Sequence, residues 1–316
     1  MVLVFKAISN LEKNYCINNF TFLIVNFQSL CYTYIVLGYI IKNRYLNTDG
    51  GQNAVRSLIK AFKNRGVTLQ GIECFACHEV NLKKLQGEFA LFFDKDIILA
   101  NFLKKSGIRV INAPLAIALT DDKAATYVHL SSFDKVKLIP TIYGPLSYQK
   151  QKIVDGEFLD FVQKQFSYPI VVKHNTGSLG KQVFLAKNCS ELKKLFLANS
   201  NIPHQYQSFI DCNNSDIRIY TIGGKVVASI KRFNSRSFIS NASCGGEGEK
   251  IVVPNSLKET AEFIARELNL DYGAIDFLFD GSQYYFLEAN SNAYFTLAEK
   301  LGIDIAGKLA DFICNK

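Results

Sequence analysis

The segment GAIDFLFDGSQYYFLEAN, near the C-terminus, constrains the fold most strongly because it has the pattern of a buried β-hairpin. Two apolar runs flank Asp280-Gly281, a dipeptide typical of tight turns between antiparallel strands. Asp276 and Glu288 each lie six residues from Ser282, so a hairpin centred there places them opposite each other. The sequence therefore predicts two neighbouring strands that bring two carboxylates together.

An amide accompanies these carboxylates. Glu288 and Asn290 are two residues apart and so share one face of a strand. Asp276, Glu288 and Asn290 can thus converge on one point. Two carboxylates and an amide oxygen suit a hard divalent ion such as Mg²⁺, which also binds phosphate oxygens. The alternative is a polar strand end in solvent, with Asp276 pointing outward.

The N-terminal half alternates predicted strands and helices. An apolar strand over residues 33–41 is followed by the turn NTDGG and an amphipathic helix with Val55, Leu58, Ile59 and Phe62 on one face. Further strands and helices follow with short connections, which is typical of a parallel sheet. This half of the chain therefore predicts an α/β domain.

The middle of the chain leads into different units. The segment LTDDKAATYVHLSSF predicts a helix with Thr120 or Asp121 as its N-cap. Pro140 and Pro145 mark the transition to a unit of helix, strand, glycine loop, strand and helix. Strands dominate the remainder, so we expect α+β units to follow the α/β domain.

A glycine loop lies between two predicted strands in VVKHNTGSLGKQVFL. Such a loop can lay backbone N–H groups over phosphates while Lys173 supplies charge. It is not a Walker A motif, because Asn175 stands at the first glycine position and Gln182 follows Lys181 where Ser or Thr is needed. Taken alone, the loop is better explained as a plain hairpin with a glycine turn.

The segment DIRIYTIGGKVVASIKR places charges on a sheet. Asp216 and Arg218 share a strand face, and the strand returning from the Gly-Gly turn ends in Lys231 and Arg232. Such cations are ordinary solvent charges when exposed. They bind phosphate or carboxylate when they face a cleft.

Composition narrows the class of protein. The 316 residues suffice for two or three domains, and 48% hydrophobic with 20% charged residues indicates a folded chain. The net charge of +8 favours anionic partners. Because the basic residues are spread along the chain and Trp is absent, we expect no nucleic-acid partner.

The eight cysteines are irregularly spaced, which indicates reduced thiols in a cytoplasmic protein. Cys74, Cys77 and His78 fit the C-x-x-C-H pattern of haem attachment. The pattern occurs once, no export signal is clear, and Met1 is the sole methionine available as a second axial ligand. We therefore expect neither haem nor a metal ion there.

Residues 14–41 contain no charged residue and are a candidate membrane span. Several Asn and Gln residues dilute this run, and its last part makes a good strand. We favour an appendage of unclear role over residues 1–32, with membrane anchoring through residues 14–41 as the alternative. We expect residues 1–32 to be dispensable, and natural translation to begin nearer Leu37 at a non-standard codon.

The order of these motifs resembles the ATP-grasp superfamily, and most closely its RimK-like branch of ribosomal-protein-modifying glutamate ligases. The motifs are DDK with Lys123, the strand and loop from Lys173 to Gly180, YQSFI, DIR, GGKVVASIKR, SNASCGG, AID and LEANSN. Each is weak alone, but their order is specific. The resemblance covers roughly residues 36–316.

The resemblance implies an ATP-grasp fold, α/β and α+β in class, with an N-terminal pre-ATP-grasp α/β domain. The implied divisions are residues 33–137 for the pre-ATP-grasp domain, 138–205 for lobe A and 206–316 for lobe B. The two lobes would clasp ATP between their sheets.

The resemblance also implies roles for single residues. Two lysines and a mobile loop would contact the phosphates, a hinge would meet adenine through its backbone, and an aspartate would contact the sugar–phosphate side: Lys123, Lys173, Gly177, Ser178, Gly180, Gln207, Ser208, Phe209, Ile210 and Asp216. The implied metal ligands are Asp276, Glu288 and Asn290. The residues implied near the γ-phosphate and acceptor carboxylate are Arg218, Arg232 and Asn241.

Four departures from the family pattern fall in or near the implied site. Ser208 stands where the hinge usually carries glutamate, Gln182 replaces a loop glycine, and Ile239 replaces a basic residue. Residues 292–295 lack the Pro-Gly that often follows Asn290. The changes at Ile239 and 292–295 leave the identity of the acceptor substrate open. The positions of the lysines and of the implied metal ligands match the family pattern.

The implied reaction is ATP-dependent ligation of a carboxylate to an amine through an acylphosphate, with glutamate or a similar amino acid among the candidate substrates. The implied cofactors are ATP and Mg²⁺, with Mn²⁺ as an alternative, and a homo-oligomer is left open. One rival is a kinase on the same fold that phosphorylates a hydroxyl. The other is a non-catalytic nucleotide-binding module, for which loss of a lysine or metal ligand would be expected.

Overall fold

The computed structural model describes residues 36–42, 49–73, 85–235 and 247–315. All elements below belong to one compact unit, residues 35–316. The expectations for the N-terminal appendage, for Cys74, Cys77 and His78, and for Asn241 lie outside the described residues. Across the described residues no helix combines the length and the apolar character needed to cross a bilayer.

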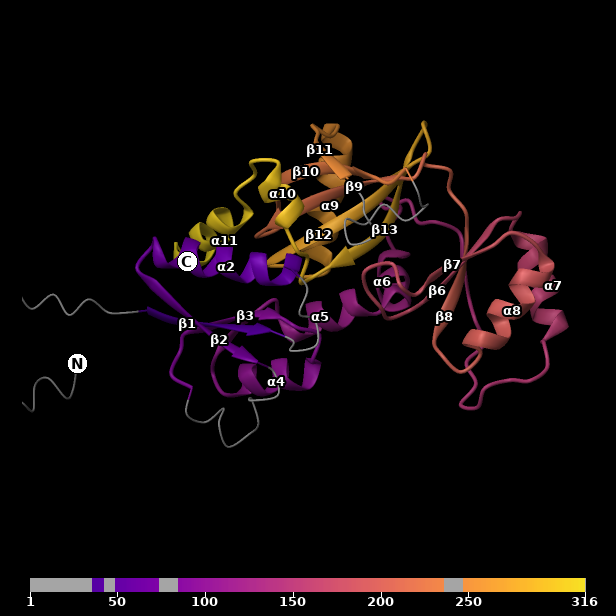
Figure 1. The fold of residues 1–316 in the computed structure, drawn as a ribbon, viewed down its shortest axis with the longest axis horizontal. Helices are drawn as coiled ribbons and strands as arrows, with labels where there is room; N and C mark the ends of the chain where they lie inside the picture. Colours follow the sequence, from indigo (N-terminus) through magenta and orange to yellow (C-terminus); the bar gives the residue numbers. More distant parts are fainter. Residues whose placement is uncertain (1–35, 43–48, 74–84, 236–246, 316) are drawn as a thin grey trace, which may run out of the picture. The chain divides into compact units, whose positions relative to one another are not determined.

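The first sheet is parallel, with the strand order β2-β1-β3-β4 (Figure 1). Its strands are Val36–Lys42 (β1), Val67–Glu73 (β2), Phe89–Phe93 (β3) and Arg109–Ile111 (β4). Its helices include Asp49–Lys63 (α2) and Ile97–Lys105 (α4). The predicted parallel α/β arrangement is therefore confirmed.

The buried face of α2 differs from the predicted one. Ala54, Leu58, Ala61 and Phe62 are buried, which is the i, i+4, i+7, i+8 spacing of one helical stripe. Ile59 is 36% exposed. Small alanines belong to the core stripe because the helix Ile305–Cys314 (α11) packs closely against α2, and a search for large apolar residues overlooks them.

Two short helices replace the single predicted helix around LTDDKAATYVHLSSF. They are Pro114–Asp121 (α5) and Lys123–Leu130 (α6). The N-cap of α6 is Asp122, whose carboxylate accepts two first-turn amides at 2.8 and 3.0 Å, so the predicted cap was wrong. Thr120 cannot be this cap because it lies inside α5, where its hydroxyl donates to the Ala116 carbonyl.

The second sheet is antiparallel and has the order β5-β8-β6-β7. Its strands are Thr141–Tyr143 (β5), Ile170–His174 (β6), Val183–Ala186 (β7) and His204–Ser208 (β8), and its helices are Gly156–Gln165 (α7) and Cys189–Asn199 (α8). These helices share a small hydrophobic core with the sheet, which contains Leu159, Val172 and Phe196. The predicted boundary between residues 205 and 206 falls inside β8, and the division into domains stays a prediction.

The third sheet has the order β11-β10-β9-β12-β13. Its strands are Ser215–Ile222 (β9), Lys225–Phe233 (β10), Glu247–Lys250 (β11), Tyr272–Phe279 (β12) and Tyr284–Asn290 (β13). The accompanying helices are Asn255–Glu267 (α9), Thr296–Lys300 (α10) and Ile305–Cys314 (α11). Asp276 is paired with Glu288 as predicted. The register of the hairpin shifts directly after this pair, at a bulge between Asp276 and Phe277.

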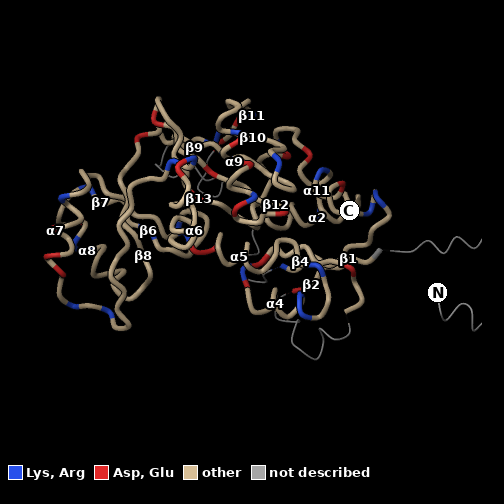
Figure 2. Tube along the Cα trace, turned by 180° about the vertical axis from the view of Figure 1, so that it is seen from behind, with Lys and Arg blue, Asp and Glu red and all other residues tan. Residues whose placement is uncertain are grey.

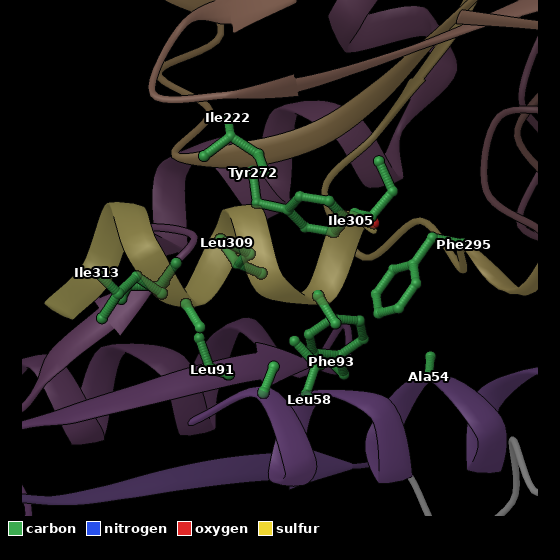
Figure 3. Close-up of a cluster of buried hydrophobic side chains, with 14 of the residues drawn as sticks. Ala54, Leu58, Leu91, Phe93, Ile222, Tyr272, Phe295, Ile305, Leu309 and Ile313 are labelled. Atoms are coloured by element: carbon green, nitrogen blue, oxygen red, sulfur yellow. The ribbon is translucent and has the colours of Figure 1, made fainter. Parts of the chain in front are cut away.

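One hydrophobic core joins the first and third sheets. Figure 3 shows Leu58, Leu91 and Phe93 packed toward side chains from the C-terminal part of the chain. Tyr272, Phe295 and Leu309 belong to the same cluster. The first sheet is therefore anchored to the third by buried apolar contacts rather than by a linker alone.

Candidate active site

A cavity of about 520 Å³ gathers most of the predicted site residues. This volume lies in the ordinary range for small-molecule sites. The predicted residues that line it are Lys123, Lys173, Gly177, Ser178, Gly180, Gln207, Ser208, Phe209, Ile210, Asp216, Arg218, Arg232, Glu288 and Asn290. Asp276 does not line it. The structure therefore brings together segments far apart in the sequence.

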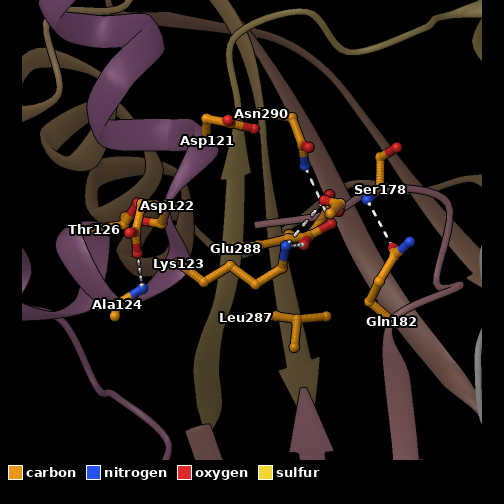
Figure 4. Close-up of polar contacts among 12 residues, drawn as sticks. Asp121, Asp122, Lys123, Ala124, Thr126, Ser178, Gln182, Leu287, Glu288 and Asn290 are labelled. Carbon is orange, nitrogen blue, oxygen red and sulfur yellow. Dashed lines mark hydrogen bonds and ion pairs between the residues drawn. The ribbon is translucent and has the colours of Figure 1, made fainter. Parts of the chain in front are cut away.

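The glycine loop between β6 and β7 forms one wall of the cavity. Gly177 and Gly180 have φ angles of 141° and 72°, which glycine adopts without steric cost. The Ser178 amide donates to the Gln182 side-chain oxygen at 3.2 Å (Figure 4). Gln182, which replaces a glycine of the family pattern, therefore fills the inside of the loop.

Lys123 joins the glycine loop to the end of β13. Its ammonium donates to the Gly177 carbonyl at 3.1 Å and lies 3.8 Å from the Glu288 carboxylate. The Asn290 amide donates to the other Glu288 oxygen at 3.2 Å, and Figure 4 shows these side chains converging. Lys123 follows the N-cap Asp122, so the first turn of α6 sets its position.

Lys173 is buried, and its ammonium lies 5.5 Å from the ring centroid of Tyr127. Burial and then the positive charge of Lys123 lower the pKa of Lys173 to about 7. The charged form is therefore poorly stabilised in the free protein, and an incoming anion such as phosphate would stabilise it.

Sequence reasoning missed two residues around Lys173. The Tyr127 hydroxyl donates to the Phe286 carbonyl at 2.8 Å and places the ring under Lys173. Gln205 is opposite Lys173 in the β6–β8 register and is fully buried, and its amide has no hydrogen-bond partner in the described part of the chain. Tyr127 is indistinguishable in sequence from an ordinary core residue of its helix, whereas a Gln inside the strand HQYQS was a usable signal.

Two arginines and two aspartates form a buried cluster beside the cavity. Arg218 donates to both carboxylate oxygens of Asp276, at 2.8 and 2.6 Å. Arg232 donates to both oxygens of Asp216, at 2.6 and 2.7 Å, and also to Asp276 at 2.9 Å. Burial raises the pKa of Asp276, but the two guanidinium groups outweigh it and hold that pKa below its usual value.

The cluster bears on the predicted Mg²⁺ site. Glu288 and Asn290 line the cavity and offer the oxygen ligands that Mg²⁺ prefers, so both fit this ion. Asp276 is 0% exposed, and both of its oxygens already accept arginine N–H groups. Within the described ranges no group of three or more His, Cys, Asp or Glu residues could hold a metal ion. The metal role of Asp276 stays a prediction that requires Arg218 to move.

The predicted hinge lies at the end of β8. The side-chain amide of Gln207 donates to the Thr141 hydroxyl at 2.8 Å, and the backbone N–H of Ser208 donates to the Pro140 carbonyl at 3.1 Å. Phe209 follows directly and lines the cavity. These bonds attach the segment to β5 and to the residue before it, so the segment is a held part of the cavity wall.

The charge on the cavity wall is predominantly positive. Six of its lining residues are Lys or Arg, and three are Asp or Glu: Lys95, Lys123, Lys173, Arg218, Arg232, Lys300, Asp49, Asp216 and Glu288. Over the described elements as a whole, Figure 2 shows basic and acidic residues interspersed. The excess of cations inside the cavity therefore favours anionic ligands there.

Comparisons with known proteins identify similar chains. A profile of the RimK-like ATP-grasp domain matches residues 120–313. An uncharacterized Mycoplasma pneumoniae protein is 31% identical over 258 residues, which are 76% of this chain and 88% of the relative. Human beta-citrylglutamate synthase B is 32% identical over 228 residues, which are 70% of this chain and 57% of that enzyme.

Solved structures share the fold. A RimK-domain ATP-grasp protein of Sphaerobacter thermophilus superposes with a TM-score of 0.65 at 20% identity, covering 87% of this chain and 99% of that one. The D-alanine–D-alanine ligase of Bacillus anthracis, solved in complex with ATP, gives a TM-score of 0.68 at 19% identity. This superposition covers 89% of this chain and 96% of the ligase. These likenesses support the predicted ATP-grasp architecture.

Proposed function

The chain belongs to the RimK-like ATP-grasp family, and from this premise we propose that it is an ATP-dependent ligase that joins a carboxylate to an amine. The observation that carries the proposal is the position of Lys123. Its ammonium contacts the glycine loop on one side and Glu288 on the other, at 3.1 and 3.8 Å. A triphosphate bound there would meet backbone N–H groups, two lysines and the carboxylate–amide pair together.

The proposed reaction has two steps. A carboxylate oxygen of the substrate attacks the γ-phosphorus of ATP, an O–P bond forms, and the bond to ADP breaks with its electrons leaving on ADP. The amine nitrogen then attacks the acyl carbon, and phosphate leaves as the C–N bond forms and the amine loses a proton. Catalysis is chiefly positioning and charge stabilisation, so no nucleophile from the protein is required.

The residues around the cavity suit this sequence of events. Lys123 and Lys173 would hold the phosphates and offset charge as it moves to ADP. Arg218 lines the cavity and would orient the substrate carboxylate. Glu288 and Asn290 would hold Mg²⁺, which neutralises phosphate charge when bound.

Relatives support an amino acid as the amine. Human N-acetylaspartylglutamate synthase A is 30% identical over 224 residues, and beta-citrylglutamate synthase B is similar at 32%. Both are named after compounds that contain glutamate. This chain spans a little more than half of each of these enzymes, at 56% and 57%. Glutamate or a similar amino acid is therefore our proposed amine.

The test is to trap the intermediate. The full chain is incubated with ATP, Mg²⁺, a panel of carboxylates and hydroxylamine, which converts an acylphosphate to a hydroxamate. The ligase predicts both ADP and hydroxamate. A kinase acting on a hydroxyl gives ADP and a phosphorylated alcohol without hydroxamate, and a binding module gives neither product. Either of the last two outcomes would contradict the proposal.

A further inference from the structure

The cavity has a second end that the nucleotide chemistry above does not use. It is lined there by the first turn of α2 and by the segment from Asn292 to Lys300, which includes α10. The Thr296 hydroxyl donates to the Gly50 carbonyl at 2.9 Å and fastens these two segments together. The walls of this end therefore hold a fixed relation to each other.

Two opposite charges face this end of the cavity. Asp49 and Asn53 are one helical turn apart on α2, and Thr296 and Lys300 are one turn apart on α10, so each pair shares a helix face. All four residues line the cavity. Neither Asp49 nor Lys300 forms an ion pair with any residue in the described part of the chain.

A carboxylate and an ammonium that have no ion-pair partner among the described residues, at one end of a cavity, complement a dipolar ligand. The head of an α-amino acid carries both charges on one carbon, so its ammonium suits Asp49 and its carboxylate suits Lys300 and the Asn53 amide. In the rest of the cavity lining the predominant charges are cationic, with Arg218 and Lys123 among them. A ligand held by its head would therefore be favoured when its side chain is anionic.

Resting on the ligase function proposed above, we propose that the carboxylate substrate is an acidic α-amino acid held by its head between Asp49 and Lys300. Its side-chain carboxylate is directed to Arg218 and is the group that becomes activated. The side-chain oxygen forms the bond to the γ-phosphorus, and ADP leaves. The amine then displaces phosphate at the side-chain carbonyl, so the product is a side-chain amide whose α-amino and α-carboxyl groups are free.

Binding tests the proposal without relying on turnover. Calorimetry is performed on the full chain loaded with Mg²⁺ and a non-hydrolysable ATP analogue, with L-glutamate, L-aspartate, N-acetyl-L-glutamate or glutarate as titrant. We expect an acidic amino acid to bind about fivefold or more tightly than either glutarate or the N-acetyl compound, since each lacks part of the head. Glutarate binding as tightly as glutamate would overturn the proposal.

Variants identify the two ends of the head. Asp49→Asn should weaken glutamate about fivefold while leaving N-acetyl-L-glutamate unchanged, because only glutamate has the ammonium. Lys300→Ala should weaken both compounds, because both keep the α-carboxylate. Asp134→Asn and Lys308→Ala change exposed charges outside the cavity and serve as matched controls. Unchanged glutamate affinity in both Asp49→Asn and Lys300→Ala would place the amino acid elsewhere and overturn the proposal.

The two proposals fail in different ways. If no acidic amino acid binds the nucleotide-loaded chain while other carboxylates yield hydroxamate, the subsite and the assignment of glutamate as the amine are both wrong, whereas the ligation of a carboxylate to an amine stands. If glutamate binds through Asp49 and Lys300 but no carboxylate yields hydroxamate, the ligase is wrong and the amino-acid subsite stands. Where hydroxamate forms from glutamate, its mass-spectrometric fragments must show the side-chain isomer, and the α isomer would contradict the assigned orientation.

Discussion

At the scale of single residues, Lys173 couples burial to ligand binding. Burial, together with the charge of Lys123, lowers the pKa of Lys173 from its ordinary 10.5 to about 7 in the free protein. Phosphate oxygens beside it would raise this pKa again. At pH 8, ATP binding should therefore take up a proton, and ATP affinity should fall as the pH rises above 7, since the neutral amine must be protonated first. Calorimetry in buffers of different ionisation enthalpy measures this uptake.

Lys173→Met should abolish the proton uptake and weaken ATP, whereas Lys308→Met, at an exposed position, should change neither. The lowered pKa of Lys173 also makes the free energy of unfolding depend on pH. Between pH 7 and 10.5 the unfolded chain binds the proton and the folded chain does not, so Lys173 makes the nucleotide-free protein more stable as the pH rises through this window. An uptake that is equal in wild type and Lys173→Met would assign the proton to another group.

Arg218 also combines structural and chemical roles. Its guanidinium makes two hydrogen bonds, at 2.8 and 2.6 Å, to Asp276, which has no solvent exposure. Arg218→Ala leaves this carboxylate with Arg232 alone, and we expect about 3 kcal/mol of destabilisation in urea unfolding. Arg266→Ala, at an exposed site, should cost under about 1 kcal/mol. In the folded fraction of Arg218→Ala, the turnover rate should fall by a larger factor than the affinity for ATP. An equal loss of both would contradict the assignment of Arg218 to the substrate carboxylate.

At the scale of elements, local patterns predicted what depends on neighbours in sequence. The turn at Asp280-Gly281 and the apolar runs around it were enough to predict the β12–β13 hairpin and the pairing of Asp276 with Glu288. The contact between Arg232 and Asp276 was not predictable, because it depends on β9 lying between β10 and β12. Sheet order is a long-range property, and no local pattern near Arg232 indicates it.

Helix caps are predictable only in part from the local sequence. The run Thr120, Asp121, Asp122 offers three good capping residues in succession, and only the break between α5 and α6 selects Asp122. We expect Asp122→Ala to lower the free energy of unfolding by about 1 kcal/mol. Because Asp122 precedes Lys123, this variant should also raise the KM for ATP. Asn188→Ala removes the comparable cap of α8, away from the cavity, and should lower stability alone. A normal KM for ATP in Asp122→Ala would show that the cap does not position Lys123.

At the scale of the whole described unit, hydrophobic contacts cross the divisions that the sequence suggests. The predicted domain over residues 33–137 contributes Leu58 and Phe93 to the same core as Tyr272 and Leu309. The second sheet has a separate core around Leu192 and Phe196. The first and third sheets should therefore lose structure together, whereas the second sheet can open by itself.

This difference can be measured with two matched core variants. Leu309 and Leu192 are both 0% exposed, and truncating either to alanine should cost about 2–5 kcal/mol. In Leu309→Ala, hydrogen exchange should accelerate in β3 and β12 together, because both strands pack on the core that has lost the side chain. In Leu192→Ala the acceleration should be confined to β6 and its neighbours, since the core around Leu192 belongs to the second sheet. Faster exchange in β12 without β3 would mean that the first sheet is stable without this core. The amino-acid subsite between α2 and α10 would then lack the rigid support that we infer for it.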